Sequence, residues 1–248
     1  MTEDGLTPAL ELPVNQALDL LCNGELDVEG RLVEASNTTL YCSVRHRGLL
    51  AACVYKPVAG ERPLWDFPEG TLAEREVAAY EVSAASGWKI VPPTVYRDGP
   101  FGPGMVQLWI DVNQTVDVVA LLRRSNSRQL RRIAVFDAVI NNADRKGGHL
   151  LPTRPGHIYG VDHGVTFNAD PKLRTLLWQW AGEPLTEEAV DTLSALRAQL
   201  EGPLGSRLRQ LLTTREVRRT VRRVDQLLTA RCHPWPEGDW PAVPWPPM

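Results

Sequence analysis

The stretch that decides the fold is VFDAVINNADRKGGHL at residues 135–150, which IYGVDHG follows at residues 158–164. An apolar run with the periodicity of a helix ends in a polar loop that contains Asp144, two basic residues and a histidine. A short apolar strand then leads to Asp162 in an Asp-His-Gly turn. The sequence therefore predicts a helix, a charged loop and a strand that bring two carboxylates into one region.

This layout is that of a phosphoryl-transfer site. Such a site needs a carboxylate beside the acceptor hydroxyl, a metal held on the phosphates, and a cation where charge develops. We assign Asp144 as the base or orienting group, Lys146 as the cation, and Asp162 as the metal carboxylate. His149 lies where the kinase catalytic loop has its metal-binding Asn. The alternative is an ordinary connection, because Asn, Asp and Gly gather in loops for turn reasons alone.

The composition is that of an ordinary soluble globular protein. Of its 248 residues, 43% are hydrophobic and 23% are charged, enough for one large domain or two lobes around a cleft. The net charge of -3 gives no global attraction to nucleic acid, so we expect no nucleic-acid partner. No apolar run approaches the length of a spanning helix, and the N-terminus does not read as a signal peptide. We expect a cytoplasmic protein; peripheral membrane contact and oligomeric state stay open.

The N-terminal part predicts a small helix near residues 14–23 and then three strands in hairpin succession between residues 25 and 57. The first turn between strands, EASNTT at residues 34–39, contains no glycine. Its short side chains leave backbone N–H groups free to meet phosphate, as a glycine-rich loop would. The candidate phosphate-binding residues are Ser36, Asn37 and Thr38. A plain hairpin turn explains these residues at least as well.

Lys56 ends the third strand, and an acidic helix is predicted over residues 70–81. The expected buried stripe of this helix consists of Leu72, Val77, Tyr80 and Ala84. Glu76 lies at the edge of that stripe. Kinases hold the α- and β-phosphates of ATP with a strand lysine paired to a helix glutamate, and we choose Glu76 over Glu74 for this pair. A solvated lysine at a strand end is the alternative.

Two further strands are predicted at residues 90–96 and 104–111, with a turn between them. The second strand leads into the helical half, so it is the place for a hinge whose backbone groups read an adenine edge. The candidate hinge residues are Gln107, Leu108, Trp109 and Ile110. A plain core strand is the alternative, and the two interpretations are compatible.

The C-terminal part predicts a loop with Lys172 and Arg174, two tryptophans, and two helices near residues 187–200 and 206–231. Lys172 and Arg174 face either solvent or an anionic substrate. For the two tryptophans, a place in the core is favoured over contact with lipid. The arginines of the second helix form a basic face, for which a solvated surface is favoured over membrane or nucleic acid. The Pro/Trp-rich tail is expected to be strapped over the body by its tryptophans rather than free.

Five short motifs carry a family resemblance. They are YKP at 55–57, REVAAY at 75–80, QLWI at 107–110, NADR at 142–145 and VDHGVTF at 161–167. In order and approximate spacing they resemble the phosphatidylinositol 3-/4-kinase-like superfamily, and five motifs in register are a strong signal where one is weak. The chain looks most like the compact type II phosphatidylinositol 4-kinases and their small bacterial relatives, and more distantly like HipA-like protein kinases.

The resemblance implies an α+β, two-lobed, protein-kinase-like fold. It implies a β-rich N-lobe at residues 1–110 and a helical C-lobe at residues 111–232, followed by the tail at residues 233–248. It also implies ATP and a divalent metal, Mg²⁺ or Mn²⁺, in the cleft between the lobes. The phosphate acceptor is a hydroxyl of a phosphoinositide-type lipid, a protein Ser/Thr or a small polyol, and the sequence does not choose among them.

Two departures from the family pattern support a second hypothesis, a nucleotide-binding pseudokinase that acts as a sensor or scaffold. His149 replaces the expected Asn, and an imidazole ligand suits Mn²⁺ better than Mg²⁺. The turn at residues 34–39 lacks the usual glycine. In favour of the enzyme, the set of Lys56, Glu76, Asp144 and Asp162 is complete.

Overall fold

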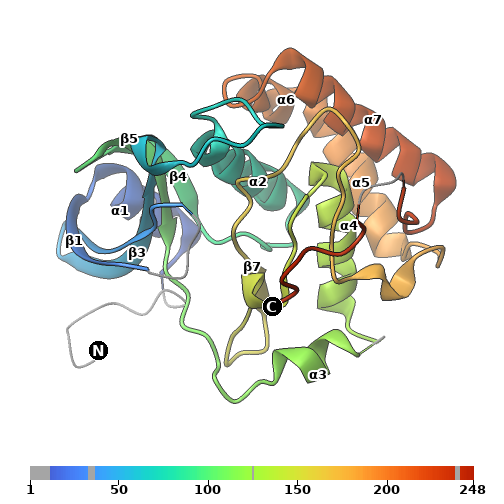
Figure 1. Cartoon of the computed structure of the whole chain (residues 1–248), viewed down its shortest axis with the longest axis horizontal. Coiled ribbons are helices and arrows are strands. Elements are labelled where there is room, and N and C mark those ends of the chain that lie inside the picture. The colour runs from blue at the N-terminus through green and yellow to red at the C-terminus, as the bar shows by residue number, and fades with distance from the viewer. Residues whose placement is uncertain (1–11, 33–36, 125, 238–240) are drawn as a thin grey trace.

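A five-stranded antiparallel sheet forms one side of the molecule, and most of the helices form the other (Figure 1). The structure is a computed structural model that describes residues 12–32, 37–124, 126–237 and 241–248. The strand order in the sheet is β1-β2-β3-β5-β4. The strands are β1 (Glu25–Arg31), β2 (Leu40–His46), β3 (Leu49–Pro57), β4 (Thr94–Gly99) and β5 (Gly102–Leu108). The mixed α+β class and the three N-terminal strands agree with the sequence prediction.

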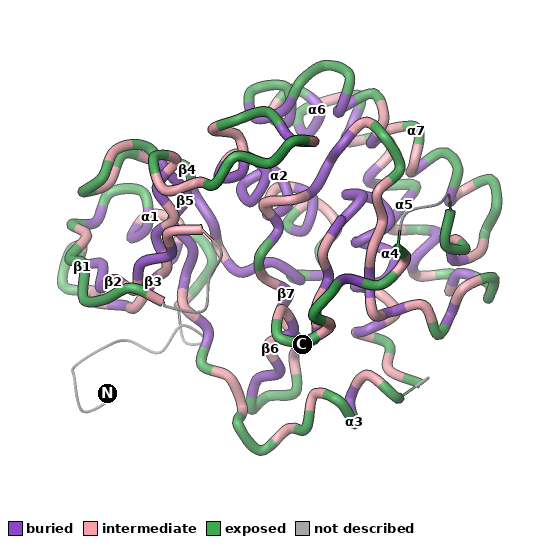
Figure 2. The backbone as a smooth tube through the Cα atoms, in the orientation of Figure 1, coloured by how far each residue is buried: buried purple, intermediate pink, exposed green. Residues whose placement is uncertain are grey.

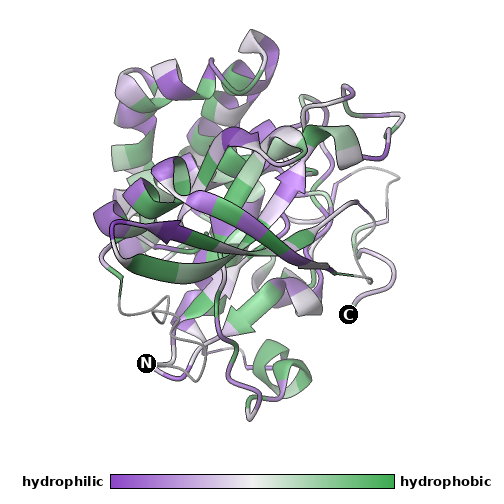
Figure 3. Cartoon of the chain, turned by 90° about the vertical axis from the view of Figure 1, so that its left-hand side faces the viewer, coloured by the Kyte–Doolittle hydropathy of each residue, from purple (hydrophilic) through white to green (hydrophobic). Residues whose placement is uncertain are grey.

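The sheet packs one face against α1 (Val14–Asn23), and α2 (Leu72–Ser86) lies toward the other. Strand β3 buries Ala51, Cys53 and Tyr55 in the cluster that contains α1. Because side chains alternate along a strand, Lys56 points to the opposite face, toward α2. Hydrophobic and hydrophilic residues are mixed along the strands in the view of Figure 3.

Helix α2 buries most of its predicted stripe, but Ala84 is exposed, so that part of the prediction is wrong. Ser83 takes the buried position in the last turn instead, because its Oγ accepts the N–H of Val91 at 2.9 Å. The helix ends at Gly87, whose φ of 70° is left-handed. Glu76 is 1% exposed, which places it inside the protein rather than at an edge.

The boundaries of β4 and β5 differ from the prediction. Strand β4 begins at Thr94 rather than at residue 90, because residues 92 and 93 are both prolines and have no N–H to donate to a neighbouring strand. Strand β5 begins at Gly102, whose φ of 90° lets the chain reverse in the tight turn after Phe101.

The second half of the chain is mainly helical around one large apolar cluster (Figure 2). A two-stranded sheet of β6 (Leu150–Pro152) and β7 (Ile158–Gly160) lies within it. The helices are α3 (Val118–Leu122), α4 (Arg128–Ile140), α5 (Glu187–Leu200), α6 (Pro203–Leu208) and α7 (Thr214–Ala230). Within the described ranges, no helix has the length and apolar character needed to cross a membrane.

The helix predicted over residues 206–231 is two helices, α6 and α7. The break has a local cause, because Thr213 and Glu216 form a capping box in which each side chain binds the other residue's backbone N–H. Glu216 therefore lies in the first turn of α7 and is buried.

The C-terminal tail returns from the helical side toward β7, and its last residues lie near the middle of the view in Figure 1. Backbone carbonyls fasten it: Ala242 O accepts from Trp178 Nε1 at 2.8 Å, and Pro247 O accepts from the Gly147 N–H at 2.8 Å. Trp235 and Trp245 are 67% and 84% exposed. The tail is thus strapped over the body, but through hydrogen bonds to its backbone carbonyls rather than through its tryptophans as predicted, and Trp240 lies outside the described residues.

Candidate phosphoryl-transfer site

A pocket of about 510 Å³ lies between the sheet and the loops that follow α4. It is lined by Leu32, Asn37, Thr39, Val54, Lys56, Gln107, Leu108, Trp109, Ile110, Val112, Gly148, His149, Leu151, Val161 and Asp162. The structure therefore gathers most of the predicted nucleotide and metal residues around one cavity. Of the remaining candidates, Glu76, Thr38, Asp144 and Lys146 lie outside the lining, and Ser36 lies outside the described residues.

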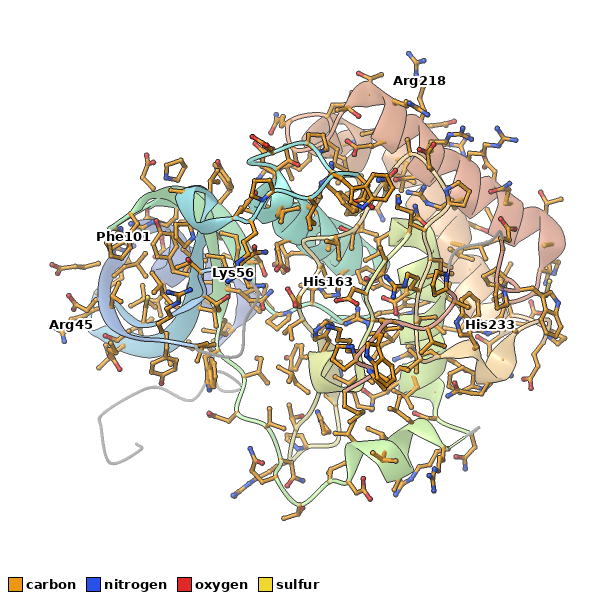
Figure 4. The ribbon with its side chains drawn as sticks, viewed as in Figure 1. Arg45, Lys56, Phe101, His163, Arg218 and His233 are labelled. Atoms are coloured by element: carbon orange, nitrogen blue, oxygen red, sulfur yellow. The ribbon has the colours of Figure 1, made fainter. Side chains whose placement is uncertain are left out.

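Lys56 joins two carboxylates from different parts of the chain. Its Nζ lies 2.6 Å from Glu76 Oε1 on α2 and 2.9 Å from Asp162 Oδ1, which follows β7. Glu76 also accepts the backbone N–H of His163 through Oε2 at 2.8 Å. Figure 4 places Lys56 between the sheet and the helical half, with His163 toward the centre of the molecule. The predicted choice of Glu76 over Glu74 agrees with this geometry.

The three charges perturb one another strongly. Burial alone would lower the pKa of Lys56, but the Asp162 and Glu76 carboxylates outweigh it, so this pKa is raised and the ammonium stays charged. Lys56 holds the pKa of Asp162 well below its ordinary value. Burial raises the pKa of Glu76, and Lys56 opposes that rise. One cation between two carboxylates leaves a net negative centre, which an added cation would balance.

Asp162 reaches this position through an uncommon backbone conformation. Its φ is 61°, in the left-handed region that Asp tolerates better than most residues but that still costs about 1 kcal/mol. The flanking chain fixes it, because the Val161 N–H donates to His149 O at 3.0 Å and Val161 O accepts from Arg145 at 3.1 Å. The carboxylate is half-exposed and faces the pocket.

Asp144 and Lys146 lie next to each other, with Lys146 Nζ 3.3 Å from Asp144 Oδ2. The Asp144 N–H donates to Asn142 Oδ1 at 3.0 Å, which fixes the start of the loop. Burial raises the pKa of Asp144, while Lys146 and His149 lower it to a lesser extent. A carboxylate with a raised pKa is a better proton acceptor, as a general base requires.

A buried ion pair behind this loop was not anticipated from the sequence. Arg145 and Asp137 are both 0% exposed, and their closest contacts are 2.9 and 3.0 Å. Arg145 also approaches His163 Nε2 at 2.6 Å, and Asn142 donates to Asp137 Oδ1 at 3.0 Å. The available signal was Asp137 itself, a carboxylate inside an otherwise apolar helical run.

His149 is placed to join Asp162 in holding a metal ion. Its Nε2 lies 3.3 Å from Asp162 Oδ2, and its Nδ1 accepts the Lys146 N–H at 3.4 Å. Burial lowers the pKa of His149, which favours the neutral imidazole that a metal ligand must be. Three His, Cys, Asp or Glu side chains arranged as a metal site do not occur among the described residues. Two protein ligands still fit an ion whose other ligands are phosphate oxygens and water.

The turn and the hinge differ from their predicted roles in one respect, because several of their N–H groups are already bonded. The Thr38 N–H donates to Gly60 O at 3.0 Å. The Leu108 N–H donates to Pro93 O at 2.9 Å and the Trp109 N–H to Ala52 O at 3.1 Å. In this conformation these three groups are not free to bind phosphate or to read an adenine edge. Gln107 is buried and donates to Thr94 Oγ1 at 2.8 Å, so it also fits the core-strand interpretation.

The chain is similar over nearly its whole length to one curated protein. It is 42% identical over 261 aligned residues to Protein Rv2133c of Mycobacterium tuberculosis, and the match covers 92% of this chain and 94% of that protein. It is 28% identical over 152 residues to phosphatidylinositol 4-kinase gamma 4 of Oryza sativa subsp. japonica. That match covers 52% of this chain but only 26% of the rice protein. No protein-family model matches the chain.

Among solved structures, the chain is similar to the Helicobacter pylori proinflammatory kinase CtkA. The TM-score is 0.53, the sequence identity is 11%, and the match covers 86% of this chain and 94% of the other. At this identity the likeness concerns the fold alone. The α+β architecture described above is therefore kinase-like.

Proposed function

Since the chain belongs to the family of Protein Rv2133c and has a kinase-like fold, we propose that it is an ATP-dependent kinase. The observation that carries this proposal is the ion pair of Lys56 and Glu76 beside Asp162. A lysine held by a helix glutamate next to a metal carboxylate is the arrangement that phosphoryl transfer uses. The similarity to a plant phosphatidylinositol 4-kinase supports the finer assignment to the phosphatidylinositol 3-/4-kinase-like superfamily.

On this proposal, residues 1–110 form the N-lobe, residues 111–232 form the C-lobe, and ATP binds in the pocket between them. Lys56 binds phosphate oxygens, and Glu76 orients its ammonium group. Asp162 and His149 hold a divalent ion, Mg²⁺ or Mn²⁺, which neutralises phosphate charge when bound. The residues around the pocket that would contact the nucleotide are Asn37, Gln107, Leu108, Trp109 and Ile110.

The transfer step is proposed to use the loop after α4. Asp144 accepts the proton of the acceptor hydroxyl, while the hydroxyl oxygen forms a bond to the γ-phosphorus of ATP. The bond between that phosphorus and the bridging oxygen breaks, and ADP leaves. Lys146 lies 3.3 Å from Asp144 and stabilises the charge on the transferred group. The acceptor is a phosphoinositide-type lipid, a protein Ser/Thr or a small polyol, and the rice relative favours the lipid.

A second candidate is a pseudokinase that binds nucleotide as a sensor or scaffold. Specific contacts favour it, because the Thr38 N–H is bonded within the protein and the Gly147 N–H is bonded to the tail carbonyl of Pro247. Both groups border the region where phosphates would be bound. The two candidates share the ATP pocket and differ in turnover.

The test is transfer of labelled γ-phosphate from ATP, with Mg²⁺ or Mn²⁺, to separate pools of lipids, proteins and polyols. We expect label in one pool with the natural protein and none with Asp144→Asn. Asp191→Asn is the matched control, because Asp191 is an exposed carboxylate on α5. If ATP binds but no pool is labelled with either metal, the kinase proposal fails and the pseudokinase is the better account.

A further inference from the structure

A second pocket, of about 460 Å³, lies on the helical side of the molecule and shares no lining residue with the ATP pocket. It is bounded by the end of α4, the segment after Phe167, one side of α7 and the start of the tail. We call it the arginine pocket, after Arg219, Arg222 and Arg223 of α7 in its wall. Its volume is within the range of small-molecule sites.

In the part of the chain that the structure describes, the three arginines form no ion pair with a carboxylate. Arg223 donates to three neutral acceptors, Val139 O at 2.8 Å, Asn168 O at 3.3 Å and Thr220 Oγ1 at 2.9 Å. Among the described residues, no ion pair joins Arg219, Arg222 or Arg223 to an acid. Three guanidinium groups therefore lie along a single cavity without a direct ion pair among the described residues, although Glu216 adds a favourable interaction at Arg223.

Three acids of the neighbouring segments are paired with other basic residues. Glu216 pairs with Arg75 at 2.6 Å, and Asp170 pairs with Arg215 at 3.2 Å. Asp66 pairs with Lys172, another residue of the pocket wall, at 2.8 Å. Of the described residues that line the pocket, Glu237 is the acid, and it is exposed.

The electrostatics of Arg223 agree with this imbalance. Burial and, after it, the neighbouring Arg219 lower the pKa of Arg223 to about 9. An anion in the pocket would remove this unfavourable interaction between like charges.

Part of the remaining wall is apolar. Leu173, Trp178 and Leu227 contribute side chains to it, together with Trp235 of the tail. The ring of Trp235 is 67% exposed yet has a fixed neighbour, because a Cβ at Gly182 would lie only 2.5 Å from Trp235 Cζ2. The pocket thus offers an aromatic and aliphatic wall next to its cationic one.

We propose that the arginine pocket binds an amphipathic organic anion, with a phosphate or carboxylate head on the arginines and an apolar body against Leu227 and Trp235. Guanidinium groups bind such heads through charge-assisted hydrogen bonds, and the apolar wall excludes water from the remainder of the ligand. A phosphate without an apolar body would leave that wall uncovered. An alcohol without charge would leave the arginines uncompensated.

The position of the pocket connects it to the proposed kinase site. Asn141 lines it and binds three backbone groups of the next segment, donating to Asn168 O and Asp170 O and accepting the Lys172 N–H at 2.9 Å. The residue after Asn141 is Asn142, which fixes the Asp144 loop. A bound anion would hold this segment in the arrangement seen, so the site is suited to regulation as well as to binding.

Calorimetric titration with octyl phosphate below its micelle concentration tests the proposal, with inorganic phosphate and octanol as the two half-ligands. We expect one octyl phosphate per chain and at least tenfold weaker binding of each half-ligand. Arg222→Gln should weaken octyl phosphate binding about tenfold, since it removes a charged contact. Arg218→Gln is the matched control, because Arg218 is exposed on α7, outside the pocket lining, and points away from the body in Figure 4.

Two further measurements separate this site from the ATP pocket and identify the source of the anion. Lys56→Met should leave octyl phosphate binding unchanged, so failure of the kinase proposal does not affect the result. Vesicle binding that needs phosphatidylserine and Arg222 assigns a lipid headgroup, and octyl phosphate binding without vesicle binding assigns a free amphiphile. No binding of octyl phosphate, equal binding of octanol, or equal losses in Arg218→Gln and Arg222→Gln would overturn the proposal.

Discussion

Two ion-pair networks meet at the candidate site, and they differ in what surrounds them. The pair of Arg145 and Asp137 is fully buried. In the pair of Lys56 and Glu76, the glutamate is buried but the lysine side chain is 20% exposed, and the third member, Asp162, is 50% exposed and faces the pocket. His163 touches both networks, with its ring at Arg145 and its backbone N–H at Glu76.

The difference separates a structural network from one that can respond to a ligand. Arg145 donates to Asp137, to Val161 O and toward His163, and these partners all belong to the protein. Lys56 instead bonds a carboxylate that solvent reaches, so ATP or a metal can replace part of that interaction. Changes in the first network should therefore act on stability, and changes in the second on ligand binding.

The largest effect is expected for Asp137→Asn, which leaves the Arg145 charge buried without its carboxylate. Breaking a buried pair in this way typically costs about 3–5 kcal/mol of unfolding free energy. Urea denaturation measures it. Asp170→Asn removes an exposed pair with Arg215 and should cost less than about 1 kcal/mol. If Asp137→Asn were as mild as Asp170→Asn, the structural role of the first network would be wrong.

The next effect is on nucleotide affinity. Lys56→Met removes the ammonium that we place on the phosphates, and a charged hydrogen bond of this kind contributes about 2 kcal/mol. ATP binding should weaken at least about tenfold in a calorimetric titration. Lys89→Met supplies the control, because Lys89 is exposed and is not among the residues that line the pocket. If Lys56→Met bound ATP as tightly as the natural protein, Lys56 would not be part of the phosphate site.

A smaller effect is expected for the metal preference. If His149 is a ligand, ATP should raise the melting temperature more with Mn²⁺ than with Mg²⁺, because imidazole nitrogen suits the transition ion. His149→Asn restores an oxygen ligand and should reduce that difference severalfold or reverse it. If the difference in melting temperature between Mn²⁺ and Mg²⁺ were the same in the natural protein and in His149→Asn, Asp162 would hold the ion without residue 149.

The smallest effect concerns the tail. Trp178→Phe replaces the indole with a smaller phenyl ring and removes the Nε1–H that Ala242 O accepts, and one such hydrogen bond is worth about 1 kcal/mol. We expect a loss of that size in unfolding free energy. Trp245→Phe should change nothing, because this side chain is 84% exposed. Equal losses in the two variants would contradict the carbonyl-based strap.

The sequence predicted the parts of the site that depend on local periodicity. It put Lys56 at the end of the third strand and, from the helical stripe, chose Glu76 rather than Glu74 as its partner. The parts of the site that depend on partners far apart in the sequence were either not predicted or differ from the prediction. The Arg145 and Asp137 pair needs the loop to fold back on α4, and the Thr38 N–H is taken by Gly60 of a later segment. The tail's attachment by carbonyls has no side-chain signature, so composition suggested the tryptophans instead.

The most direct test of the central claim measures ATP affinity and phosphoryl transfer, or slow ATP hydrolysis, in Asp144→Asn and Asp162→Asn side by side. Asp144 is placed to act on the acceptor, so its variant should bind ATP nearly as well as the natural protein and lose turnover. Asp162 is placed to hold the metal and contacts Lys56, so its variant should lose both. The kinase account would be contradicted if the natural protein bound ATP but showed no turnover with either metal, and if Asp144→Asn behaved in the same way.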